Sequence, residues 1–261
     1  MKKVLLVKLG GSVITDKKKP YTAKASNIKS LARTIGQIHK NGTPLILGTG
    51  AGSFGHYPVL RHKIDKEVKT KAQLLGFALT HSRVTTLNGL VVEALLKEGV
   101  PAIAIHPSSV IDASGGKVKS FYLDTLIGAL RSGLVPVVYG DVVLDEKRGG
   151  VVVSTETIFE ELAKRLPRSG VDIARAIYVS NTPGVLDQSG RVIPRINRLD
   201  KLALRTDNST NGYDVTGGMQ AKVDSAIRLA RKGISVYIVG ANPPKGITQA
   251  AKGDSVGTRI S

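Results

Sequence analysis

The sequence of 261 residues contains no cysteine and no tryptophan, and only 4% of its residues are aromatic. Without cysteine, neither disulfides nor thiolate metal sites can form, which suits a protein of the cytoplasm. No apolar run approaches the roughly 18 residues that a membrane-spanning helix needs. The apolar run near the amino terminus, Val4–Val7, is too short for a signal peptide. We therefore expect a cytoplasmic globular protein without a membrane partner.

Acidic residues are also scarce, since 20 Asp and Glu stand against 38 Lys and Arg and the net charge is +18. Such a charge attracts nucleic acids, anionic membranes and phosphorylated small molecules. The basic residues are scattered, however, and only Lys17-Lys18-Lys19 form a tight run. Few aromatic side chains are available for stacking on exposed bases. We therefore expect a small phosphorylated partner, and a nucleic-acid binder is the weaker alternative.

Several catalytic motifs are missing as well. The chain has no Walker pattern, no protein-kinase catalytic loop, no serine nucleophile elbow and no His/Glu metal helix. Hydrolase chemistry of these kinds therefore has no support.

Glycine is abundant where apolar strands end. The stretch Gly48–His56 contains four glycines and follows the apolar run Pro44–Leu47. Glycines of this kind have no use in a packed core, but they let a backbone bend and turn its N–H groups toward an anion. His56 closes the stretch with an imidazole that can donate to a phosphate oxygen. We interpret it as a phosphate-binding loop, with a plain turn and a surface histidine as the alternative.

Two further glycine turns have the same character. Gly10-Gly11 follows the first strand, between Lys8 and Lys17, and Gly217-Gly218 opens a helix near the carboxyl end. The amino-terminal end of a helix favours anions because its N–H groups are unpaired. Each turn also has an ordinary structural interpretation, with solvated lysines beside it. Three such loops together indicate a nucleoside triphosphate and a second anionic substrate.

The order of elements predicts an α/β fold. The first 56 residues are a strand, a glycine turn, a helix that Ser26 can cap, a strand and a second glycine turn. Strands and helices alternate along the rest of the chain, with a hairpin at 142–154. This pattern favours a mostly parallel sheet covered on both faces, with the glycine turns at one edge. We expect a lobe boundary near Pro167–Asp172.

Motifs along nearly the whole chain resemble the amino acid kinase superfamily: Lys8–Ser12, Gly50–His56, Gly140–Asp145, Asp214–Met219 and Gly257–Arg259. Within it, the loop that ends in His56 and the segment Phe77–Thr80 look most like the isopentenyl phosphate kinases. The resemblance implies an αβα sandwich with two lobes, residues 1–170 for the phosphoryl acceptor and 171–261 for ATP. It also implies a homodimer and ATP-dependent phosphorylation of isopentenyl phosphate to isopentenyl diphosphate, with Mg²⁺, in isoprenoid biosynthesis.

The same resemblance implies roles for individual residues. Lys8 and Lys17 would contact the transferring phosphoryl group, His56 would hold the acceptor's phosphate, and Glu156 would orient the lysines. The other acceptor-side residues would be Gly10, Gly11, Gly50, Ala51, Gly52, Gly55 and Asp141. The nucleotide-side residues, besides Lys8, would be Asn181, Gly184, Asp214, Thr216, Gly217, Gly218 and Lys222. No residue is implied as a metal ligand, and Mg²⁺ is expected to bridge phosphate oxygens.

The chain departs from the family pattern at two places. Ser154-Thr155-Glu156 stands where Ser-Gly-Asp is usual, and Asn181–Gly184 stands where an acidic Asp-x-Asp-Gly is common. Ordinary structural interpretations also stay open for three residues. Lys222 is then a solvated helix lysine, Asp141 caps a turn or pairs with a lysine, and Phe77 packs in the core instead of lining a pocket for the isoprenoid tail. Asp145 is expected only to shape the hairpin. At the level of function, the alternative is a kinase of another small phosphate, phosphonate or carboxylate.

Overall fold

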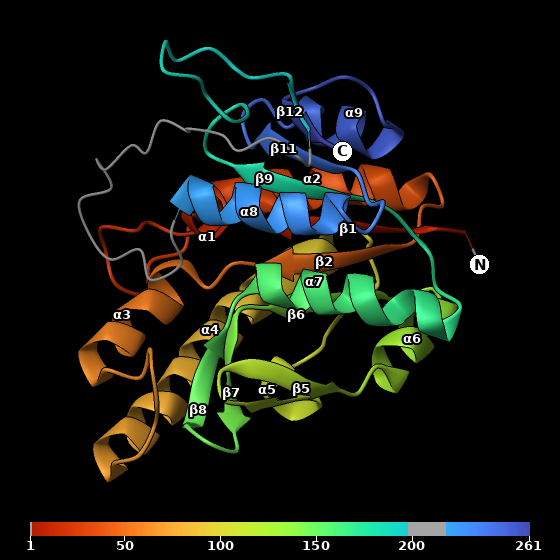
Figure 1. The fold of residues 1–261 in the computed structure, drawn as a ribbon. Coiled ribbons are helices and arrows are strands. Elements are labelled where there is room, and N and C mark those ends of the chain that lie inside the picture. Colours follow the sequence, from red (N-terminus) through yellow and green to blue (C-terminus); the bar gives the residue numbers. More distant parts are fainter. Residues whose placement is uncertain (1, 198–217) are drawn as a thin grey trace.

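In the computed structural model, strands from the alternating pattern form one large sheet, and helices pack against it (Figure 1). The structure describes residues 2–197 and 218–261. All neighbouring strands described in this sheet are parallel except β11 and β12. The α/β class and the mostly parallel sheet are therefore confirmed. In spatial order the strands are β10 (Arg195–Ile196), β12 (Thr258–Ile260), β11 (Val236–Gly240), β9 (Ile173–Ser180), β1 (Val4–Leu9), β2 (Leu45–Thr49), β6 (Val135–Tyr139) and β3 (Ala102–Ala104).

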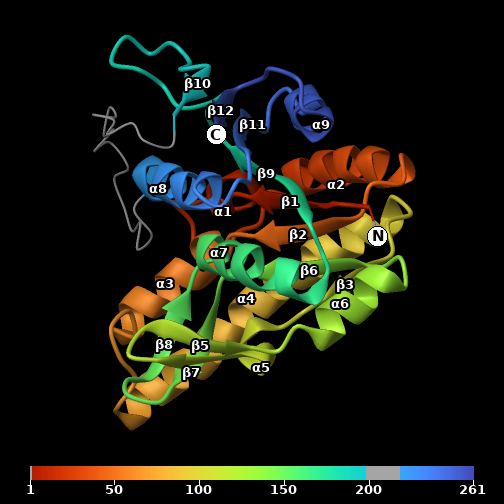
Figure 2. The ribbon, with the colours of Figure 1, turned by 45° about the vertical axis from the view of Figure 1, so that its right-hand side comes forward.

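Helices cover both faces of this sheet, as an αβα sandwich requires (Figure 2). Side chains alternate along a strand, so Leu5 and Val7 of β1 face one helical layer while Leu6 faces the other. The layer on the side of Leu5 contains α2 (Ala25–Lys40), α4 (Lys71–Lys97) and α9 (Lys245–Lys252). The layer on the side of Leu6 contains α6 (Asp124–Arg131), α7 (Thr155–Arg165), the 3-10 turn Leu166–Ser169 and α8 (Gly218–Ala230).

A smaller four-stranded sheet adjoins the large one. Its order is β5 (Lys117–Phe121), β4 (Ile111–Ser114), β7 (Asp141–Asp145) and β8 (Gly149–Val153). The hairpin of β7 and β8 was expected from the sequence, but Asp145 does more than shape it. Its carboxylate accepts hydrogen bonds from the backbone N–H groups of Gly115, Gly116, Lys147 and Arg148, so that it holds two turns together.

The parallel strands bring the glycine turns to one edge of the large sheet. Leu9 pairs with Thr49 of β2 and with Val179 of β9, and Thr49 pairs with Tyr139 of β6. The residues that follow these strand ends therefore emerge side by side. Because β9 pairs with β1, the sheet is continuous across the expected lobe boundary.

Short helices occupy this edge: α1 (Gly11–Ile14), α3 (Gly52–His62) and α5 (Pro107–Val110). The helix α3 and the strand β2 each correct one expectation. His56 does not close a loop, because it lies inside α3. Gly48 does not belong to a loop either, because it is a buried residue of β2. A Cβ there would lie 2.5 Å from Thr155 Cγ2 and 2.8 Å from the Phe159 ring, so this glycine does serve core packing.

The expected cap of α2 by Ser26 is also wrong. The helix already begins at Ala25, and its N-cap residue Lys24 makes no side-chain cap hydrogen bond. An antiparallel bridge between Thr15 and Ala23, together with the bond from Lys24 N to Ile14 O, fixes where the chain enters the helix. In the described residues, we find no helix that is both long and apolar enough to cross a membrane.

Candidate active site

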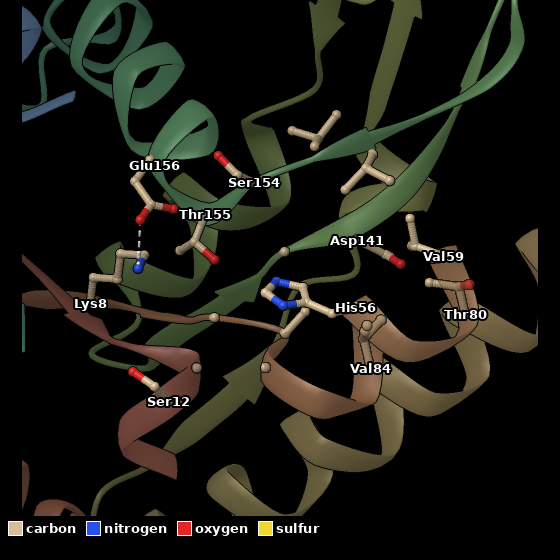
Figure 3. A pocket seen from close by; sticks show the side chains of 18 of the residues that line it. Lys8, Ser12, His56, Val59, Thr80, Val84, Asp141, Ser154, Thr155 and Glu156 are labelled. Atoms are coloured by element: carbon tan, nitrogen blue, oxygen red, sulfur yellow. Dashed lines mark ion pairs between the residues drawn. The ribbon is translucent and has the colours of Figure 1, made fainter. Parts of the chain in front are cut away.

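A cleft lies at the edge where the glycine turns meet, and it encloses about 770 Å³ of space, including solvent at its mouth (Figure 3). Lysines, glycines and one histidine line one part of it, and valines line another. The residues expected for the site that line it are Lys8, Gly11, Lys17, Gly50, Ala51, Gly52, Gly55, His56, Asp141, Glu156, Gly218 and Lys222. Residues far apart in the sequence therefore share one cavity.

Lys8 and Glu156 form an ion pair across the cleft. The distance from Lys8 Nζ to Glu156 Oε1 is 2.8 Å, and the two side chains are only 5% and 16% exposed. Burial alone would raise the pKa of Glu156, but the charge and hydrogen bond of Lys8 outweigh it and keep this pKa below its ordinary value. Glu156 lies in the first turn of α7, where the helix dipole also favours a carboxylate. Glu156 therefore stays ionised near neutral pH.

An aromatic ring supports Lys8 from another side. Lys8 Nζ lies 5.9 Å from the centroid of the Tyr178 ring. Burial raises the pKa of Tyr178, so its phenol is neutral, and its hydroxyl oxygen lies 3.0 Å from Ser225 Oγ. The ammonium group is thus fixed between a carboxylate and a ring face.

The first two glycine loops are in direct backbone contact. A Cβ on Gly11 would lie 2.5 Å from Gly52 N, and a Cβ on Gly50 would lie 2.5 Å from Gly11 N. Gly52 has a φ of +50°, a conformation that side-chain-bearing residues rarely adopt. Glycine is therefore required here by close approach of two backbones. The result is a floor of peptide groups without side chains, which suits an anion.

Helix ends add to this electrostatic character. In the part of the chain that the structure describes, four helices begin with residues that line the cleft: α1 at Gly11, α3 at Gly52, α7 at Thr155 and α8 at Gly218. The N–H groups at such ends are positively polarised, so they favour phosphate oxygens. Figure 3 shows His56 of α3 between the Lys8–Glu156 pair and the apolar side of the cleft.

The apolar side of the cleft is formed by α3, α4 and β8. Its residues are Val59, Thr80, Val84, Val152 and Val153. Phe77, which lies one turn before Thr80 on α4, instead packs against the small cluster of Val59, Ile64, Val68 and Val142. The contacts of Phe77 therefore favour the alternative in which it is a packing residue of the core. The sequence therefore drew attention to the right segment of α4, in which Thr80 lines the cleft and Phe77 does not.

Asp141 lies behind this side of the cleft, and its side chain is fully buried. Its oxygens lie 3.1 and 3.2 Å from His81 Nδ1, and they accept hydrogen bonds from the N–H groups of Val142 and Ser108. The hydrogen bond to Asp141 raises the pKa of His81, although burial opposes this rise. Asp141 thus joins α4, α5 and β7.

The nucleotide-side residues are placed as follows. Lys222 Nζ donates to Gly218 O at 3.3 Å, and its charge helps to lower the pKa of Glu156 after the larger contributions given above. Asn181 Nδ2 donates to Ser12 O at 3.3 Å, and Gly184 packs against Thr258. Neither Asn181 nor Gly184 is a lining residue of the cleft. Asp214, Thr216 and Gly217 lie outside the described residues.

On the acceptor side, Gly10 does not line the cleft. A Cβ on Gly10 would lie 2.8 Å from Val179 O, so this residue packs against β9 instead.

Several lining residues escaped the sequence analysis. Ser154 caps α7 by accepting from Thr157 N at 3.1 Å, and Thr155 Oγ1 donates to Thr49 O at 2.7 Å. The valines of β8 and Val84 were missed as well. Val84 lies four residues after Thr80, on the same helix face, and this spacing was the signal available for it.

The cleft's carboxylates do not suit a metal ion held by the protein. In the ranges 2–197 and 218–261, no group of three His, Asp or Glu side chains is placed to hold one. Glu156 is paired with Lys8, and Asp141 with His81. We therefore assign no described residue as a metal ligand.

The comparisons with known proteins agree with one another. Residues 3–240 match the amino acid kinase family. The chain is 36% identical to an isopentenyl phosphate kinase of Methanothermobacter thermautotrophicus, with 99% of both chains covered. It is 32% identical to one of Haloferax volcanii, with 98% of both covered. The X-ray structure of an isopentenyl phosphate kinase matches with a TM-score of 0.80 at 32% identity, over 98% of this chain and 100% of that one.

Proposed function

Because this chain belongs to the amino acid kinase family, and within it to the isopentenyl phosphate kinases, we propose that it transfers the γ-phosphoryl group of ATP to isopentenyl phosphate. The products are isopentenyl diphosphate and ADP. The observation that carries this proposal is the cleft itself, in which Lys8, Lys17 and His56 line a polar floor beside an apolar wall. An acceptor with a phosphate head and a short hydrocarbon tail matches those two surfaces.

The acceptor's phosphate would lie on the floor of the cleft. His56 would donate to one of its oxygens, and the backbone N–H groups around Gly11, Gly50 and Gly52 would surround it. The tail would extend between Val59, Thr80, Val84 and the valines of β8. Exclusion of water by these side chains would hold the acceptor in one orientation.

The reaction then needs no general base. An oxygen of the acceptor's phosphate is already anionic and attacks the γ-phosphorus, while the bond from that phosphorus to the β–γ bridging oxygen breaks. Lys8 and Lys17 would neutralise the charge that develops on the transferring group. Glu156 would keep Lys8 in place, so most of the catalysis would come from alignment and charge neutralisation.

The nucleotide would approach from the side of α8. Gly218 and Lys222 line the cleft there, and the start of α8 favours phosphate oxygens. Asn181, Gly184, Asp214, Thr216 and Gly217 keep their proposed roles in holding the nucleotide. In this proposal residues 1–170 bind the acceptor and residues 171–261 bind ATP. Mg²⁺ carried by the nucleotide would neutralise β- and γ-oxygens.

We also propose that the protein works as a homodimer. The support is that β3 is an outer strand of the large sheet and carries Ile103, which is exposed, while Leu90 and Leu96 of α4 are exposed as well. Light scattering on the purified protein would test this, and a mass of one chain would contradict it. A cytoplasmic location, supported by the absence of cysteine, is part of the same proposal.

An acceptor screen with coupled detection of ADP tests the function. With ATP and Mg²⁺, we expect turnover on isopentenyl phosphate and much less on small phosphates that lack a hydrocarbon tail. Turnover only on another phosphate, a phosphonate or a carboxylate would instead assign the chain to that substrate. Tight, steeply salt-dependent binding of DNA or RNA without any ATP turnover would favour the nucleic-acid alternative that the charge of +18 raised.

A further inference from the structure

Thr15 is a fully buried residue that links the first two glycine loops, although it does not line the cleft. It follows α1 directly. Its Oγ1 donates to Gly11 O at 2.7 Å and accepts from Ser53 N at 3.1 Å. Its own backbone N–H also donates to Gly11 O, at 2.8 Å. One hydroxyl group therefore joins the turn after β1 to the first turn of α3.

The hydrogen bond from Ser53 N to Thr15 Oγ1 supplies a helix cap that the residues next to α3 do not provide. The first N–H groups of a helix have no partner within the helix, and a side chain at the N-cap usually accepts from one of them. The N-cap residue of α3 is Ala51, which has no side chain that can do so. Thr15 takes this role from another part of the chain by accepting from Ser53 N.

The two loops meet through glycine backbones, and a Cβ on Gly52 would lie 2.1 Å from Thr15 Oγ1. Val13 and Ile14 of α1 and Phe54 of α3 also belong to one buried cluster. The bond from Gly50 N to Leu9 O, at 2.9 Å, fixes only the start of the second loop. Thr15 fixes its far end, at Ser53. His56 follows three residues later, on the adjacent turn of the same helix.

We propose that Thr15 is a positioning residue, whose hydroxyl sets the separation between the N–H groups at Gly11 and the imidazole of His56. It does not touch the substrate. It keeps the donors from α1 and from α3 at the spacing that one phosphate group requires. This inference rests on the proposed function, because it assumes that the acceptor's phosphate binds between these donors.

The test replaces the hydroxyl without changing the volume. Thr15→Val leaves the buried Ser53 N–H without an acceptor, whereas Thr15→Ser keeps one. We expect Thr15→Val to raise the KM for isopentenyl phosphate about tenfold, the loss expected for one hydrogen bond, while the KM for ATP stays within about twofold. We expect Thr15→Ser to restore the KM for the acceptor to near the original value.

Thr34→Val is the matched control. Thr34 is also buried and its Oγ1 also donates to a carbonyl four residues back, Ser30 O at 3.1 Å, but it lies in α2 away from the cleft. Both valine variants are expected to lower the melting temperature, and only Thr15→Val is expected to change the KM for the acceptor. An unchanged KM in Thr15→Val would overturn the proposal and leave Thr15 a merely structural residue. If Thr15→Val does not fold, Thr15→Ala takes its place.

Binding of inorganic phosphate, measured by calorimetry, separates this inference from the proposed function. If the original protein turns over no acceptor, the proposed function fails, but its phosphate affinity can still be compared with that of the variants. Weaker phosphate binding in Thr15→Val than in Thr34→Val supports the positioning role. Equal binding in the two variants overturns it.

Discussion

Lys8 Nζ and Glu156 Oε1 lie 2.8 Å apart in a cleft that hides most of both side chains. The pair joins the strand β1, which carries Lys8, to the helix α7, which carries Glu156. Glu156 stands where the family resemblance led us to expect aspartate. From the first turn of α7, the longer side chain of Glu156 brings its carboxylate into contact with the Lys8 ammonium group.

Glu156→Gln should lower kcat about 10- to 100-fold, because Lys8 would no longer be held at the position of the transferring group. It should also destabilise the fold by about 1–3 kcal/mol, because a buried ammonium group loses its partner. Coupled ADP detection and urea unfolding measure the two effects. Glu160→Gln is the control, since Glu160 lies on the same helix but pairs with Arg228. Similar losses of kcat in both variants would contradict the role of Glu156.

The same pair predicts a pH dependence. The folded pKa of Glu156 is below its ordinary value, so its stabilising effect is present above the unfolded pKa and is lost as the pH falls through the folded pKa. The stability difference between the original protein and Glu156→Gln should therefore be constant from pH 5 to 8, by the ordinary glutamate pKa of about 4.3, and shrink at lower pH. A difference that grew on acidification would contradict this.

His56→Ala should raise the KM for isopentenyl phosphate about 10- to 100-fold, the effect of one hydrogen bond to a charged phosphate. The KM for ATP should change little, because α3 lies on the acceptor side of the cleft. Steady-state kinetics with each substrate varied in turn measures both. His39→Ala is a suitable control, since His39 lies in the last turn of α2. An acceptor KM that is unchanged in His56→Ala would remove His56 from the acceptor site.

The sequence predicted β1, β2 and β6 and the edge at which they end, because each is a mainly apolar run that a glycine follows. It did not predict β4 and β5. It failed at α3. Glycine has a low intrinsic preference for helix, so Gly48–His56 was interpreted as a loop, although α3 begins at Gly52. In the structure a Cβ on Gly55 would lie 2.5 Å from Ala51 Cβ and 3.2 Å from Val84 Cγ1. Close packing against Ala51 and against Val84 of α4 therefore explains this glycine, and no local pattern distinguishes such packing from contact with a ligand.

Only part of the site was predicted, because local sequence does not show contacts between distant residues. Lys8, Lys17 and His56 stand beside glycine turns, so local sequence drew attention to them. Thr15 and His81 do not, because their importance comes from partners 38 and 60 residues away. Contacts of that kind depend on the register of whole elements, which sequence periodicity does not fix.

The contribution of His81 to stability should depend on pH in the direction opposite to that of Glu156. The hydrogen bond to Asp141 raises its pKa in the folded state, so its stabilising effect is present below the unfolded pKa of about 6.5 and is lost as the pH rises through the folded pKa. His81→Gln should therefore destabilise the protein more at pH 6 than at pH 8.5, values that flank the ordinary histidine pKa of about 6.5. Urea unfolding at the two pH values measures this. A larger loss at the alkaline pH would contradict it, and His39→Gln serves as the control.

Gly48→Ala should destabilise the protein by about 1–3 kcal/mol, because the new methyl group has no space beneath α7. It would lie 2.5 Å from Thr155 Cγ2 and 2.8 Å from the Phe159 ring, and both belong to the helix that carries Glu156. A shift of α7 would therefore lower kcat as well. Gly89→Ala provides the contrast, since a Cβ there meets nothing within 4 Å and lies in the helix α4. That change should stabilise the protein by about 0.5–1 kcal/mol. Urea unfolding should give opposite signs for the two substitutions, and equal signs would mean that backbone preference rather than packing explains Gly48.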